Sequence, residues 1–181
     1  MRSFCEPLIE IVVNWKRAYI VQFEGLKEGL HHFDFEVNDA FFAVIEGSLV
    51  EQGNFEVSLK LEKKSTLMEF DFSGSGVIQG QCDRCGDPLD VSVSWDKKLI
   101  VKYGNPGEEP SDDLVFLPHN AYEIDVAPFI YEFIVLAIPR RNVHEDGQCN
   151  EEALRLLDEL NAKNEEVDPR WNKLTDLNSL N

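Results

Sequence analysis

Positive charge is scarce in this chain of 181 residues. Lys and Arg together number 17 against 34 for Asp and Glu, which gives a formal net charge of −17 at pH 7. Attraction of nucleic acid to the whole surface requires the opposite sign, so an RNA contact would need a local basic patch. The acidity suits a basic partner, and it is equally explained as a means of keeping the protein soluble.

Long apolar runs are also missing. The most apolar stretch, residues 126–138, is too short to span a bilayer and contains Pro128 and Glu132. It is better explained as a buried helix. The start of the chain has no basic segment followed by a continuous apolar run, which is the pattern of a signal peptide. We therefore expect a soluble, cytoplasmic protein with no membrane partner.

Catalytic signatures are absent from the sequence as well. It contains no internal repeat, phosphate-binding loop, GxSxG, HExxH or dinucleotide-binding fingerprint. Asp and Glu are abundant, but no acid–base pair can be singled out. We therefore predict a protein that is not an enzyme and has no small-molecule substrate.

Cysteine is rare, and two of the four cysteines stand close together. Cys82 and Cys85 belong to the run CDRCG, in which both thiolates can turn towards one ion and the glycine allows a tight reversal. His144 and Cys149, separated by four residues, could supply two further ligands. Three sulfurs and one nitrogen form a common structural zinc site. The predicted zinc would join the middle of the chain to its C-terminal part.

Two other interpretations of these residues stay open. A redox pair is expected at a helix N-terminus, where the helix dipole lowers a thiol pKa, but Gly86, Asp87 and Pro88 are typical of a turn. The cysteines are otherwise plain reduced thiols of a reducing compartment. His144 would then be a solvated loop histidine.

Alternating apolar and polar residues predict β-structure over much of the chain. The clearest alternation covers residues 55–62, resumes at 67–72 after a polar turn and appears again at 91–103. Residues 104–113 form an acidic loop rich in Gly and Pro. An apolar stripe between Asp125, a good N-cap, and Pro139 predicts a helix packed on the dry face of the sheet.

These patterns predict an α+β fold within one domain. We expect a twisted antiparallel sheet or half-barrel of about six or seven strands, with helices in the C-terminal third. Residues 1–15 fit this pattern poorly, so we expect an N-terminal extension followed by a single domain over residues 16–181.

Three arginines are candidates for a local basic patch. Arg84, Arg140 and Arg141 would lie near the predicted zinc, and a guanidinium group binds phosphate in a bidentate manner. They are therefore candidate RNA contacts. The alternative is that they neutralise neighbouring carboxylates of this acidic chain.

Taken in order, these segments resemble a bacterial family that includes YceD, the large-subunit ribosomal RNA accumulation protein. The resemblance covers residues 16–178. Its pieces are YIVQFEGLKEG, CDRC, an acidic segment with a short apolar strand, YEIDVAPFIYEFIVLAIP, VHEDGQC and DPRWNKLTDL. Many relatives carry a second cysteine pair where this chain has His144 and Cys149. The GLKEG opening and the single downstream cysteine look most like versions from the Bacteroidetes.

The resemblance implies a role in accumulation or maturation of large-subunit (23S) ribosomal RNA during ribosome biogenesis, without a known catalytic activity. The expected partner is ribosomal RNA, a large-subunit ribosomal protein or another assembly factor. A protein-only adaptor or chaperone for a basic ribosomal protein is the alternative. An RNA-processing enzyme is a third possibility, for which the sequence offers no nucleophile.

Overall fold

The computed structural model describes residues 17–104 and 113–163. Contacts divide the chain into two compact units, one formed by residues up to 79 together with 90–140, the other by residues 80–89 together with those from 141 onwards. The prediction of a single domain over residues 16–181 stays a prediction. The expected extension over residues 1–15 and most of the acidic loop, residues 105–112, lie outside the described part.

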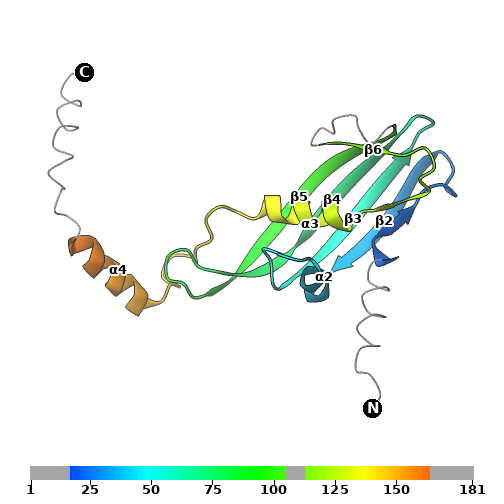
Figure 1. The fold of residues 1–181 in the computed structure, drawn as a ribbon. Coiled ribbons are helices and arrows are strands. Elements are labelled where there is room, and N and C mark those ends of the chain that lie inside the picture. Colours follow the sequence, from blue (N-terminus) through cyan, green and yellow to red (C-terminus); the bar gives the residue numbers. More distant parts are fainter. Residues whose placement is uncertain (1–16, 105–112, 164–181) are drawn as a thin grey trace, which may run out of the picture. The chain divides into compact units, whose positions relative to one another are not determined.

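A five-stranded sheet forms the centre of the first unit (Figure 1). Its order is β2 (Gly29–Val37), β3 (Gly53–Lys63), β4 (Leu67–Gln81), β5 (Pro88–Tyr103) and β6 (Leu114–Leu117). Two short strands, β1 (Ile20–Gln22) and β7 (Glu123–Asp125), form a separate antiparallel pair. The predicted α+β class is therefore confirmed, with seven strands in the described residues.

One strand pair departs from the expected antiparallel arrangement. β2, β3 and β4 pair antiparallel, but β6 runs parallel to β5, with Leu114 beside Ile100 and Leu117 beside Tyr103. β5 and β6 therefore point the same way. The sheet is mixed for that reason.

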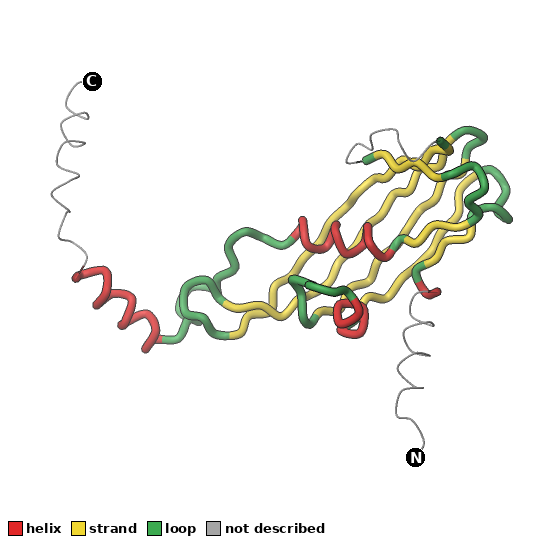
Figure 2. The backbone as a smooth tube through the Cα atoms, viewed as in Figure 1, coloured by secondary structure: helices red, strands yellow, loops and turns green. Residues whose placement is uncertain are grey.

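The core lies on one face of the sheet, as the alternation predicted. Residues at odd positions of β3 and even positions of β4 are buried, namely Phe55, Val57, Leu59, Leu61, Met68, Phe70 and Phe72. Helices α2 (Asp39–Val44) and α3 (Ala127–Ala137) pack on that face (Figure 2). The ring centroid of Phe133 in α3 lies 5.5 Å from that of Phe72 and 5.4 Å from that of Trp95.

Local side chains start both helices. The Asn38 side chain accepts a hydrogen bond of 3.1 Å from the Ala40 N–H at the start of α2. The Asp125 carboxylate accepts one of 3.0 Å from the Ala127 N–H, although Val126 holds the N-cap position of α3. Satisfying these free amides fixes where each helix begins.

Two glycines of β4 allow close packing. A Cβ atom on Gly74 would lie 2.5 Å from the Trp95 ring, and one on Gly76 would lie 2.1 Å from the Asn54 carbonyl oxygen. No side chain fits at either position without movement of its neighbours. The absence of a side chain therefore lets the Trp95 ring lie against the β4 backbone.

The second unit contains the turn between β4 and β5 and the segment that leads into α4 (Glu151–Lys163). Asn150 starts this helix, because its side chain accepts hydrogen bonds from the N–H groups of Glu152 (3.0 Å) and Ala153 (3.3 Å). Across the described ranges, no helix combines the length and the apolar character needed to cross a membrane.

Candidate metal centre

The turn between β4 and β5 orients the first cysteine pair. The Cys82 carbonyl accepts a hydrogen bond of 2.8 Å from the Gly86 N–H, and the Cys82 N–H donates one of 2.8 Å to the Asp87 carbonyl. Gly86 has a φ of 79°, in the left-handed region that glycine adopts without strain. Cys85 is followed by this turn and then by β5, so it does not begin a helix as the redox interpretation requires.

Two hydrogen bonds between Asp83 and Asn142 hold the downstream segment against this turn. The Asp83 N–H donates to the Asn142 carbonyl at 2.7 Å, and the Asn142 N–H donates to the Asp83 carboxylate at 2.6 Å. His144 follows two residues later. A turn with Gly147 at φ 84° then reverses the chain before Cys149.

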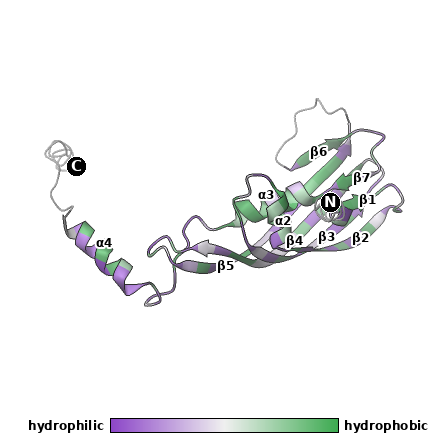
Figure 3. Cartoon of the chain, turned by 60° about the horizontal axis from the view of Figure 1, so that its bottom comes forward, coloured by the Kyte–Doolittle hydropathy of each residue, from purple (hydrophilic) through white to green (hydrophobic). Residues whose placement is uncertain are grey.

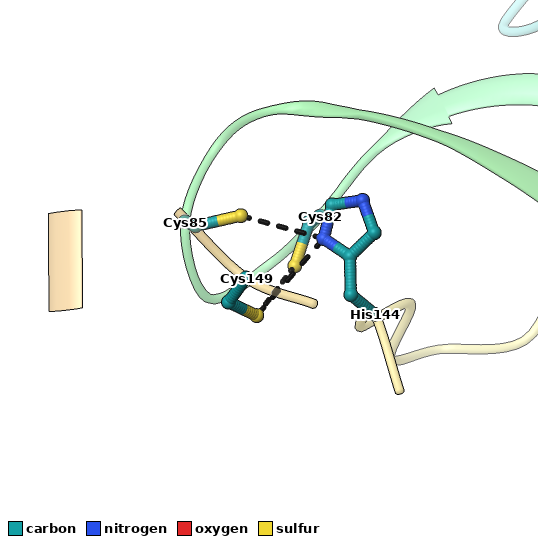
Figure 4. Close-up of side chains that lie close together, drawn as sticks. All are labelled: Cys82, Cys85, His144 and Cys149. Atoms are coloured by element: carbon teal, nitrogen blue, oxygen red, sulfur yellow. Dashed lines mark hydrogen bonds between the residues drawn. The ribbon is translucent and has the colours of Figure 1, made fainter. Parts of the chain in front are cut away.

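Four side chains from two segments that lie far apart in sequence converge here (Figure 4). The Sγ atoms of Cys82, Cys85 and Cys149 and a ring nitrogen of His144 all lie within 4.8 Å of one another. Cys82 and Cys149 are buried. The structure thus brings together the four residues that the sequence had singled out, and their role as ligands stays a prediction.

The distances in this cluster suit a tetrahedral zinc ion. Zn–S bonds of about 2.3 Å and Zn–N bonds of about 2.0 Å place two sulfurs about 3.8 Å apart and a sulfur and a nitrogen about 3.5 Å apart. The Sγ atoms of Cys82 and Cys149 are 3.9 Å apart. The His144 Nδ1 atom lies 3.4 Å from the Cys85 Sγ and 4.0 Å from the Cys149 Sγ.

The second ring nitrogen of His144 has a partner of its own. Nε2 lies 3.1 Å from the Pro88 carbonyl oxygen, which can only accept, so Nε2 carries the proton. Nδ1 then presents its lone pair to the three sulfurs. A backbone carbonyl that fixes the ring in this way is typical of histidines that bind metals.

The groups of the metal-free cluster differ in how readily they ionise. Burial raises the pKa of the Cys82 thiol, but hydrogen bonds from backbone N–H groups, those of Cys85 and His144 foremost, outweigh it and bring the pKa to about 6. For His144, burial lowers the pKa, and hydrogen bonds to Cys82 and Cys85 more than compensate, so the pKa is raised. Burial and the neighbouring sulfurs raise the pKa of Cys149. One thiol is thus a thiolate, the form that binds metals, at neutral pH.

The three candidate RNA contacts are exposed. Arg84 and Arg141 belong to the second unit, and Arg140 is the last residue of the first. No carboxylate of residues 17–104 or 113–163 forms an ion pair with any of the three guanidinium groups. The alternative in which they neutralise neighbouring acids therefore has no support in the described part, and their contact with RNA stays a prediction.

Sequence reasoning missed the supports of the cluster. The paired bonds between Asp83 and Asn142 and the acceptor for His144 at Pro88 were not foreseen. A backbone carbonyl accepts hydrogen bonds whatever its side chain, so residue identity carries no signal for it. Of these partners, Asp83 belongs to a motif that the sequence analysis had singled out, the CDRC run.

One known protein family matches the part of the chain that contains this cluster. Residues 70–178 match the family described as "Large ribosomal RNA subunit accumulation protein YceD". The match covers more than half of the chain and contains all four residues of the cluster. The chain belongs to the YceD family, as the resemblance had indicated. Neither the curated proteins nor the solved structures contain a match to the chain.

Proposed function

We propose that this chain is a cytoplasmic, non-enzymatic factor for the accumulation or maturation of large-subunit ribosomal RNA during ribosome biogenesis. The observation that carries the proposal is the family match over residues 70–178, since the family is described by large ribosomal RNA subunit accumulation. In cells that lack the chain, we expect large-subunit RNA to fall relative to small-subunit RNA and to recover with the wild-type gene. An unchanged ratio would contradict the role.

Within this function, we propose that Cys82, Cys85, His144 and Cys149 hold a structural zinc ion. The support is the agreement of their separations with a tetrahedral site and the orientation of His144. When bound, zinc supplies a crosslink between the turn after β4 and the segment before α4. Four protein ligands leave no position for a substrate, which is consistent with a structural site.

Metal analysis tests this part directly. Protein purified without chelator should contain about one zinc per chain. Cys82→Ser should lose most of this metal, whereas Cys5→Ser, which changes a cysteine outside the four proposed ligands, should keep it. Metal-free wild-type protein whose melting temperature does not change when zinc is added would contradict the site.

The RNA contact is proposed for Arg84, Arg140 and Arg141. Their exposure and lack of ion pairs in the described residues support it. Affinity for single-stranded ribosomal RNA should fall steeply with salt, and each Arg→Glu change should lower the salt slope by about 0.7 or more. Arg155→Glu is the matched control, since Arg155 is exposed and pairs with Glu151 at 3.6 Å. Equal losses in all four variants would argue against a local patch.

The second candidate function is an adaptor for a basic ribosomal protein. The net charge of −17 favours it, because a strongly acidic chain attracts basic polypeptides and repels RNA. Affinity capture from growing cells with and without RNase separates the two. A ribosomal protein retained after RNase supports the adaptor, and loss of all ribosomal partners supports the RNA contact.

A further inference from the structure

The face of the five-stranded sheet opposite α2 and α3 carries a shallow groove. Both views of the first unit place these helices on the same side of the sheet (Figures 1 and 3). The groove has a volume of about 610 Å³ and crosses β2, β3, β4 and β5. Small serine side chains from β3, β4 and β5 line it, together with four carboxylates, those of Asp34, Glu36, Glu56 and Asp96. We call this surface the acidic groove.

Two carboxylates of the groove face each other directly. Glu36 on β2 is the register partner of Glu56 on β3, and both side chains point away from the core. Like charges in directly opposed positions destabilise an antiparallel pair. Among the described residues, no lysine, arginine or histidine forms an ion pair with either of them.

The same sheet face contains a second pair of this kind, and that pair is neutralised. Glu62 on β3 is the register partner of Glu69 on β4. The Lys64 ammonium lies 3.3 Å from Glu62 and also pairs with Glu69, and the Lys98 ammonium lies 3.0 Å from Glu69. Within residues 17–104 and 113–163, the protein therefore supplies its own cations at one Glu–Glu pair and none at the other.

We propose that the acidic groove binds a lysine- and arginine-rich segment of a protein partner. Cationic side chains of that segment would pair with Glu36 and Glu56, as Lys64 and Lys98 do at the neighbouring pair. Repulsion between phosphates and carboxylates disfavours RNA on this face. The inference rests on the adaptor function proposed above and assigns its binding to one surface.

The size and lining of the groove fit an extended peptide. Four adjacent strands span about 14 Å, which an extended chain covers with about four residues. Serine hydroxyls both donate and accept hydrogen bonds, so they can pair with the amide groups of such a segment. Of these serines, Ser75 and Ser94 are exposed and Ser58 and Ser73 are half-buried, and their short side chains leave the backbone of the partner close to the sheet.

The full-length chain can be titrated against a fluorescent lysine-rich peptide, with a glutamine-substituted peptide as the neutral reference. The double variant Glu36→Gln/Glu56→Gln should weaken binding of the lysine peptide about tenfold. Glu62→Gln/Glu69→Gln is the matched control, because it removes the same charge from an equivalent pair on the same face. It should change the affinity less than about twofold.

Thermal unfolding separates the proposed effect from misfolding, because a misfolded variant would melt at a lower temperature than the wild type. Relief of the unpaired repulsion should raise the melting temperature of Glu36→Gln/Glu56→Gln by about 2 °C while its binding falls. The control variant should melt at the same temperature as the wild type or below it. If the wild type binds the peptide and both variants lose affinity equally, the assignment of binding to the acidic groove is wrong, but the adaptor function is not contradicted. If the wild type does not prefer the lysine peptide, the acidic groove and the adaptor function are both contradicted.

Discussion

Cys82 and Cys149 are separated by 67 positions in the sequence, and their Sγ atoms lie 3.9 Å apart. Both side chains are buried, so two thiolates at this distance would repel each other strongly unless a proton or a cation lay between them. A shared zinc ion removes that repulsion. If the proposed zinc is bound, its removal would therefore act directly on this pair.

Removal of zinc should loosen the segment that Cys149 holds. We expect chelator to increase the rate of tryptic cleavage after Arg140 or Arg141 several-fold, because the segment then depends mainly on the bonds between Asp83 and Asn142. Mass spectrometry of the fragments measures the rate. Cleavage after Lys97, in the middle of β5, is the internal control and should stay slow. An equal increase at both places would indicate general unfolding instead.

The lowered pKa of Cys82 makes the stability of the zinc-free chain depend on pH. The value falls from 9.0 to about 6 on folding, so the thiolate contribution is complete above pH 9 and is lost as the pH falls through about 6. Zinc-free wild type should therefore exceed zinc-free Cys82→Ser in melting temperature by more at about pH 8.5 than at about pH 5. A pH-independent difference would contradict the lowered pKa.

A methyl group at Gly76 should disrupt the pairing of β3 with β4. Its carbon would lie 2.1 Å from the Asn54 carbonyl oxygen, and that oxygen belongs to the backbone and cannot rotate away. We expect Gly76→Ala to reduce the free energy of unfolding by about 2–3 kcal/mol. Gly25→Ala is the control, since nothing lies within 4 Å of its Cβ position, and should change stability by less than about 0.5 kcal/mol. Urea denaturation measures both.

The packing of α3 on the sheet can be tested at Phe133. This side chain is 7% exposed and contacts both Phe72 and Trp95. Phe133→Ala should cost about 3–5 kcal/mol, because it leaves a cavity between the helix and the sheet. Leu136→Ala is the control on the same helix, as Leu136 is 65% exposed and should cost less than about 0.5 kcal/mol. Similar costs for both would mean that α3 does not pack through Phe133.

Much of the architecture follows from local patterns. The alternation at residues 55–62 predicted which side chains of β3 are buried, since successive side chains of a strand point to opposite faces. The stripe between Asp125 and Pro139 predicted α3 for the corresponding helical reason. The direction of β6 was not predictable in this way, because a strand pattern is the same whether its neighbour runs parallel or antiparallel.

Some features of the candidate metal centre follow from the sequence and others only from the tertiary structure. The sequence by itself determined the candidate ligands, three thiols and an imidazole at spacings that suit zinc, and the turn residues that follow Cys85. Only the tertiary structure decided that the two halves meet, that Nδ1 of His144 faces the sulfurs, and that Glu36 stands opposite Glu56. Proximity, tautomer and register depend on backbone bonds between distant segments, and side-chain identity along the chain does not encode those bonds locally.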